Sequence, residues 1–304
     1  MRLLSGLTVV CLSLYLLPAV AHDVGLVPPS TAYPASNAAV VAYAARPEWK
    51  VDITLQQSAG MPQPQALRVR VPSPFADGTA PANSLLPTEP QSSIYRFKYL
   101  DVPQVQPALP FQLIEVDWNT EGQPRGPNNS FITPHYDFHF YTKSSAFVDT
   151  RMNCVTSDKT CDAQKTDYAQ MRRFLELPPA ELMPAKAFAD TGSSITAMGL
   201  HSLDGTFDFT VESVNHNPVI IYGSFAGEIA FLEASMTLYA FSDAMEAAAS
   251  GQKSTWPIAQ PAEYAFPWWP TTLSLEYVPQ EQVFYVELGG FAYHASEPEP
   301  QVLQ

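Results

Sequence analysis

The chain has 304 residues, with 30 acidic against 16 basic side chains and a formal net charge of −14. Hydrophobic residues make up 46% of it and charged residues only 15%, a composition too apolar for a disordered chain. The excess of acid disfavours nucleic acid, because phosphates require clustered Lys and Arg, and it equally disfavours an anionic membrane surface. We therefore expect a folded protein with a sizeable core and no nucleic-acid partner.

Residues 1–21 are typical of a secretory signal peptide. Arg2 precedes an apolar run from Leu7 to Leu17, and Ala19-Val20-Ala21 provides a small-x-small cleavage site. The run is too short to span a bilayer as a helix, and no later stretch reaches the roughly 18 apolar residues that such a helix needs. The sequence predicts an exported, periplasmic or extracellular protein without a transmembrane segment, whose mature chain begins at His22.

The mature chain contains two cysteines, Cys154 and Cys161, which close a short polar loop. In an exported protein a single nearby pair predicts a disulfide. A metal site with two thiolate ligands is the alternative. Either arrangement would hold the loop locally and would say little about activity.

Short strand-like runs separated by turn residues fill most of the mature chain, which is unusually rich in proline. Two pairs of runs flank Ala226-Gly227 and Pro279-Gln280-Glu281 and predict hairpins. Thr206–Glu212 alternates with period two, which predicts a half-buried strand. This pattern favours a mostly β fold, an antiparallel sandwich or barrel. The other runs span residues 39–43, 49–55, 67–71, 94–99, 111–118 and 134–141.

Two stretches predict helices instead of strands. Lys165–Leu177 ends at Pro178-Pro179. The Ala-rich Ser242–Ser250 is closed by Gly251. Since no clear linker divides the chain, we expect a single domain over residues 22–294 and a flexible tail over 295–304. In the first helix, one face would carry Tyr168, Met171, Arg172 and Leu175.

The densest polar cluster lies in Pro134–Tyr141, a strand by its four aromatic residues. His135, Asp137 and His139 share one face of this strand, opposite the aromatic face. Residues two apart on a strand lie about 6.6 Å apart and can converge on one ion, whereas residues four apart, at about 13 Å, cannot easily do so. The sensible ligand pairs are Asp137 with His139, or His135 with Asp137.

Any metal site on this strand must be completed from elsewhere in the chain. His201 is one candidate. Glu233 is another, because it is in phase with Ile229 and Phe231 and should point toward the core, where a carboxylate needs a partner. The same pattern also suits a strand whose polar face lies in water, or a structural hydrogen-bond network. The candidate ligands for a divalent transition metal are His135, Asp137, His139, His201 and Glu233.

Several motifs follow one another along the chain: Asp117-Trp118-Asn119 with Gly122, the string Pro134–Tyr141, Pro178-Pro179, Met198-Gly199-Leu200-His201, residues 222–229 and Phe231-Leu232-Glu233. In these motifs and their order, over about residues 110–290, the chain resembles a family of exported bacterial proteins of unassigned function, typified by a thermophile protein under anti-sigma-factor control. The resemblance implies export and a mostly β fold, and it implies no reaction. The chain departs from the family pattern at Gln123, where the family usually carries a histidine, which removes one potential ligand, and at Ala234, where it often carries proline.

Two functional hypotheses follow from these residues. The first is an exported ligand-binding or envelope-stress protein without catalysis, which would bind a small molecule or a metal and could assemble as a homo-oligomer. The second is a metal-dependent enzyme, a cupin-like oxygenase or hydrolase, built on the strand of His135, Asp137 and His139. Convergence of Asp137, His139, His201 and Glu233 within about 4–5 Å of one point would favour a metal site in either case.

Overall fold

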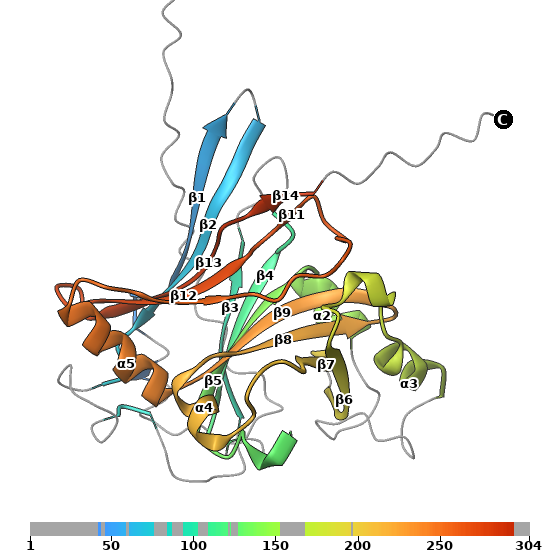
Figure 1. Cartoon of the computed structure of the whole chain (residues 1–304), viewed down its shortest axis with the longest axis horizontal. Coiled ribbons are helices and arrows are strands. Elements are labelled where there is room, and N and C mark those ends of the chain that lie inside the picture. Colours follow the sequence, from blue (N-terminus) through green and yellow to red (C-terminus); the bar gives the residue numbers. More distant parts are fainter. Residues whose placement is uncertain are drawn as a thin grey trace, which may run out of the picture.

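A computed structural model shows two large antiparallel sheets that pack face to face (Figure 1). Residues 1–21, which are expected to form a signal peptide, residues 295–304, and Cys154 and Cys161 lie outside the described residues, so the expected disulfide stays a prediction. The structure describes residues 42–43, 46–58, 61–75, 84–86, 94–102, 109–120, 122, 127–152, 168–195 and 197–294.

The larger sheet has seven strands in the order β3-β4-β5-β9-β8-β7-β6. All of its neighbouring pairs are antiparallel. Its strands are β3 (Ile94–Asp101), β4 (Leu113–Asn119), β5 (His135–Tyr141), β6 (Ala187–Ile195), β7 (Gly199–Asp204), β8 (Val219–Phe225) and β9 (Glu228–Thr237).

The smaller sheet has five strands in the order β1-β2-β13-β12-β10, and a two-stranded ribbon pairs β11 with β14. Neither large sheet closes on itself among the described residues, so the prediction of a mostly β fold is confirmed in its sandwich form. These strands are β1 (Lys50–Ser58), β2 (Met61–Pro72), β10 (Ser254–Pro257), β11 (Trp268–Trp269), β12 (Thr272–Val278), β13 (Val283–Gly289) and β14 (Ala292–Tyr293).

Helices are short and lie at the sandwich surfaces. None in the described part of the chain is long and apolar enough to cross a membrane. The α-helices are α2 (Ser145–Arg151), α3 (Tyr168–Leu175), α4 (Val211–His216) and α5 (Leu238–Ala249), and single 3-10 turns span Pro127–Asn129 and Ala180–Leu182.

The main core fills the space between the two sheets. Strand alternation places Val116, Trp118 and the aromatic face of β5 on this side, where they meet apolar residues of β2, β12 and β13. Trp118 and Tyr136 are fully buried, with ring centroids 4.8 Å apart. Helix α5 packs against β12 and β9, beside this core.

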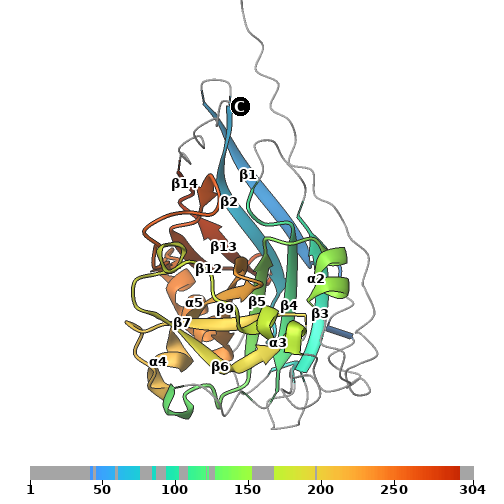
Figure 2. The same cartoon turned by 90° about the vertical axis from the view of Figure 1, so that its right-hand side faces the viewer.

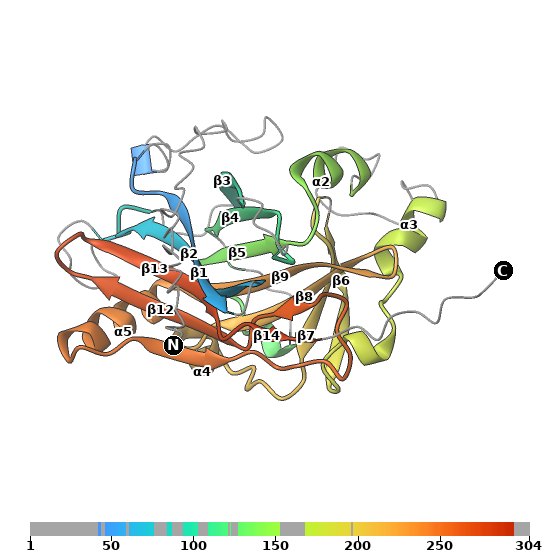
Figure 3. The same ribbon diagram turned by 90° about the horizontal axis from the view of Figure 1, so that it is seen from above.

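The opposite face of the seven-stranded sheet is also covered, as Figures 2 and 3 show from two directions. At one end, Val148 of α2 and Phe174 of α3 pack in a cluster with Tyr141 and Phe231. At the other end, Val214 of α4 packs in a cluster with strand residues including Ile221. The strip between these two apolar clusters holds the candidate site.

Several local predictions are confirmed. Both predicted hairpins form, as β8–β9 and β12–β13. The first turns at Ala226 and Gly227, both of which have positive φ. Both helices also form, although α5 begins four residues earlier than expected because Thr237 caps it by accepting a hydrogen bond from the Tyr239 amide.

Other predictions are wrong. The expected strand at 206–212 is a turn followed by α4, because Asp204 and Asp208 accept hydrogen bonds from the amides of residues 206 and 210, and Thr210 caps the helix. Ala42 and Tyr43, expected in a strand, are helical. Strands β6 and β7 were not anticipated from the sequence.

Candidate metal centre

A buried polar strip crosses the seven-stranded sheet on the face away from the main core. The register places Glu115 of β4, His139 of β5 and Glu233 of β9 in one row across the three strands. Asp117, Asp137 and Ser235 form the next row, and Asn119, His135 and Thr237 the third. All nine side chains are buried.

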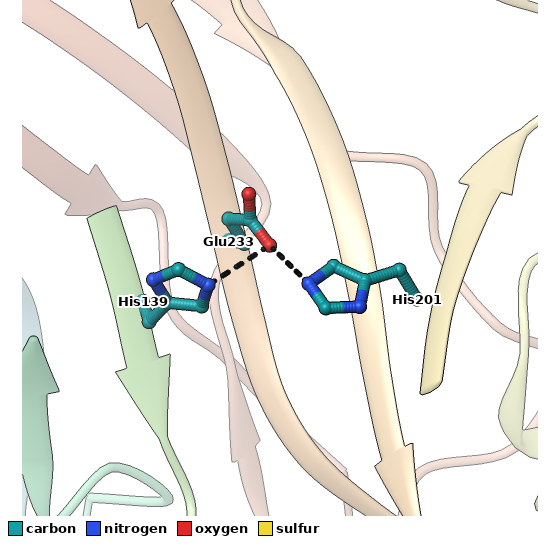
Figure 4. Close-up of side chains that lie close together, drawn as sticks. All are labelled: His139, His201 and Glu233. Carbon is teal, nitrogen blue, oxygen red and sulfur yellow. Dashed lines mark ion pairs between the residues drawn. The ribbon is translucent and has the colours of Figure 1, made fainter. Parts of the chain in front are cut away.

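Three side chains of the strip region converge on one point: His139, His201 and Glu233 (Figure 4). Nε2 of His139 lies 3.2 Å from Oε2 of Glu233, and Nε2 of His201 lies 3.3 Å from the same oxygen. One ligand atom from each residue lies within 4.8 Å of the other two. The group is almost sealed, since His139 is 1% exposed, Glu233 3% and His201 6%.

The two spacings from Oε2 of Glu233 suit a shared metal ion, and the ligand nitrogens of the two histidines lie within 4.8 Å of each other. With bonds of about 2.1 Å, neighbouring ligand atoms lie about 3.0 Å apart in octahedral geometry and about 3.4 Å apart in tetrahedral geometry. The observed 3.2 and 3.3 Å fall between these values. A charge-assisted hydrogen bond between an imidazolium and a carboxylate is shorter, at about 2.7–2.9 Å. The donor set of two imidazoles and one carboxylate is one that zinc and iron(II) use in proteins.

Burial and neighbouring charges together set the pKa values of His139 and Glu233. Burial alone would lower the pKa of His139, but the charge and hydrogen bond of Glu233, with further contributions from Asp117 and Glu115, raise the pKa to about 9. Burial alone would raise the pKa of Glu233, but His139 and His201 hold it well below its usual range. A metal ion that bound Nε2 of His139 would therefore have to displace a proton from this ring.

The aromatic rings of Phe231 and Tyr141 pack against the site. The centroid of the Phe231 ring lies 5.1 Å from that of His139 and 5.2 Å from that of His201, in edge-on contacts. Tyr141 stacks on His139 from the neighbouring position along β5. Phe231 can lie there because its neighbour across the sheet is Gly223, where an added Cβ would lie 2.0 Å from the ring.

The other two metal-ligand candidates from the sequence, His135 and Asp137, form a separate pair. Nε2 of His135 lies 3.4 Å from Oδ1 of Asp137, and Nδ1 of His135 lies 2.7 Å from the carbonyl oxygen of Thr133. Burial raises the pKa of Asp137 to about 6, and the neighbouring His135 offsets this only in part. The structure thus brings together His139, His201 and Glu233. Of the two adjacent pairs that strand spacing favoured, His135 and Asp137 do meet, but apart from this group, and Asp137 does not join His139 in it.

Sequence reasoning missed residues that shape this site. Glu115 alternates with Ile114 and Val116 in β4, a period-two signal that it shares a face with Asp117. Gly223 is an isolated glycine inside an apolar strand, a signal for close approach by another group. Glu233 is buried with His139 and His201 as partners, but the prediction that it points toward the core together with Ile229 is wrong. Ile229 packs in the main core and Glu233 lies on the opposite face, because the bulge in the β8–β9 pairing beside Gly223 breaks the alternation.

Comparison of the chain with protein-family models, with curated proteins and with solved structures gives no match. The site is therefore interpreted from its own geometry and chemistry.

Proposed function

We propose that this chain is an exported metal-binding protein that holds one divalent transition-metal ion through Nε2 of His139, Nε2 of His201 and a carboxylate oxygen of Glu233. The observation that carries the proposal is the convergence of three buried ligand atoms within 4.8 Å of one another. Side chains from three different strands meet at this point. Export is supported by the apolar run and small-x-small sequence of residues 1–21.

The charge of the surroundings also favours a cation. Four buried carboxylates, those of Glu115, Asp117, Asp137 and Glu233, lie on the strip. His139 and His201 lie beside Glu233, and they can supply compensating positive charge when protonated or by holding a bound cation. Such compensation matters because an uncompensated buried charge is costly.

The experiment is metal analysis of purified protein after reconstitution with Zn(II), Co(II) or anaerobic Fe(II). We expect about one ion per chain, as a site with a single set of three ligands requires. His139→Ala and Glu233→Gln should lose the ion. His135→Asn is the matched control, because His135 is a buried histidine on the same strand face that lies outside the converging group. An unmetallated wild type under all three conditions, or full loading of His139→Ala, contradicts the proposal.

A second candidate function is a metal-dependent oxygenase or hydrolase at the same centre. The observation that favours it is the number of protein ligands, since three leave coordination positions open for water, oxygen or substrate. His201 is the most exposed member of the group and marks the side from which such a molecule would approach. Turnover of a model ester, or oxygen consumption by the Fe(II) form, that is lost in Glu233→Gln would support this function.

A further inference from the structure

The second ring nitrogen of His139 faces away from the converging group. Nε2 points at Glu233, so Nδ1 lies on the other side of the ring (Figure 4). Nδ1 is fully buried, and no hydrogen-bond partner for it occurs among the described residues. A histidine that binds a metal through one nitrogen almost always donates the other N–H to an acceptor, and a carboxylate is a common one.

Strand β4 places the carboxylate of Glu115 opposite His139 of β5. Glu115 is paired directly with His139 across β4 and β5 and is 0% exposed. Side chains in such a pair have Cβ atoms about 4.5–5.5 Å apart on the same face of the sheet. A glutamate side chain is long enough to bridge that separation. Asp117, the next residue on this face of β4, is paired with Asp137 instead.

We propose that Glu115 is a positioning residue for the metal centre: by rotating its side chain from the position seen here, its carboxylate comes to accept the Nδ1–H of His139, which fixes the ring tautomer and leaves the Nε2 lone pair for the ion. This inference rests on the proposed metal site for its effect on affinity. Its effect on the tautomer of His139 holds with or without metal. Glu115 would not touch the ion and would act only through the histidine.

Both Asp117 and Glu115 raise the pKa of His139, so both carboxylates lie near the ring. The two acids can nevertheless be separated by experiment. Both removals delete a negative charge from the same strand face, but only Glu115 lies opposite the histidine. Asp117→Asn is therefore the matched control for charge, and Glu115→Gln keeps an acceptor oxygen while it removes the charge.

The first test measures Zn(II) and Co(II) affinity in wild type, Glu115→Met, Glu115→Gln and Asp117→Asn. We expect Glu115→Met to weaken binding about 10- to 100-fold, as loss of such an outer partner does, and to alter the Co(II) absorption spectrum. Glu115→Gln should fall between wild type and Glu115→Met, and Asp117→Asn should weaken binding less than Glu115→Met. Unchanged affinity in Glu115→Met, or an equal or larger loss in Asp117→Asn, overturns the proposal.

The second test needs no metal and separates this inference from the proposed function. Nitrogen-15 NMR of metal-free protein above the pKa of His139 reports which ring nitrogen carries the proton. We expect the Nδ1–H tautomer in wild type and in Asp117→Asn, and a shift toward Nε2–H in Glu115→Met. The Nε2–H tautomer in wild type overturns the role of Glu115, whatever metal analysis shows. If Glu115→Met does not fold, the His139 tautomer in wild type and in Glu115→Gln tests the role of Glu115 instead.

Discussion

Nε2 of His201 lies 3.3 Å from Oε2 of Glu233, although strand β8 separates the strands that carry them. Two strand spacings amount to roughly 9.6 Å, so both side chains must reach across β8. The β8 residue paired with His201 is Gly223, which has no side chain to block that path. The ring of Phe231 occupies the space above the glycine and contacts both histidines. One missing side chain thus permits the convergence.

Gly223→Ala should therefore damage both the fold and the site. The added Cβ would lie 2.0 Å from the buried Phe231 ring, which must move away from His139 and His201. Overpacking of this kind costs about 1–3 kcal/mol of unfolding free energy. Urea denaturation measures this cost, and calorimetric titration with Zn(II) should show weaker binding.

Gly289→Ala is the control for that substitution. Gly289 also lies in a strand, but its added Cβ would meet the hydroxyl of Thr272 at 3.1 Å, a contact that a side chain can relieve by small movement. We expect a smaller loss of stability and normal metal binding. Equal stability of Gly223→Ala and wild type would show that Phe231 is not held in place by the glycine.

Stability of the metal-free protein should fall in mildly alkaline solution. The pKa of His139 is raised from 6.5 to about 9, so its pairing with Glu233 is fully present below about pH 6.5 and is lost as the pH rises through about 9. A shift of this size corresponds to at most about 3 kcal/mol. Unfolding free energies of wild type and Glu233→Gln, measured from about pH 7 to pH 9.5, should converge as the pH rises. A constant difference across this window would contradict the assignment.

Metal binding should have the opposite pH dependence. The proton on His139 competes with the ion for Nε2, so affinity should increase with pH up to about 9 and binding should release protons to the buffer. Calorimetry in buffers of different ionisation enthalpy counts those protons. His135→Asn should release the same number as wild type, because His135 lies outside the converging group. Binding without proton release at about pH 7 would argue for another ligand set.

A buried tyrosine pair should anchor Tyr43 to the sheet. Tyr136 donates to the hydroxyl of Tyr43 at 2.9 Å, and Tyr43 donates to the carbonyl oxygen of Pro72 at 2.6 Å. Tyr136→Phe removes one hydrogen bond and should cost about 1 kcal/mol. Tyr43→Phe removes the donor to Pro72 as well as the acceptor of Tyr136, so we expect a larger cost, of about 2 kcal/mol. Chemical denaturation of both variants and the double variant tests this order; a smaller loss in Tyr43→Phe would reverse it.

The elements of the fold that depend on residues close together in the sequence could be predicted. Alternation along Pro134–Tyr141 identified β5 and the face that carries His139, because side-chain direction in a strand is a local property. Turn residues identified the β8–β9 hairpin for the same reason. The alternation at 206–212 led to a wrong strand prediction. Asp204 and Asp208 accept hydrogen bonds from nearby amides and hold that segment in turns.

The amino-acid sequence by itself determined a mostly β chain, the two faces of β5, and a short list of residues able to bind a metal. Only the tertiary structure decided which of them meet. The convergence of His139, His201 and Glu233 depends on the order β5-β9-β8-β7 and on the register at Gly223. Strand order and register are set by packing between segments far apart in the chain, through contacts that no local pattern encodes.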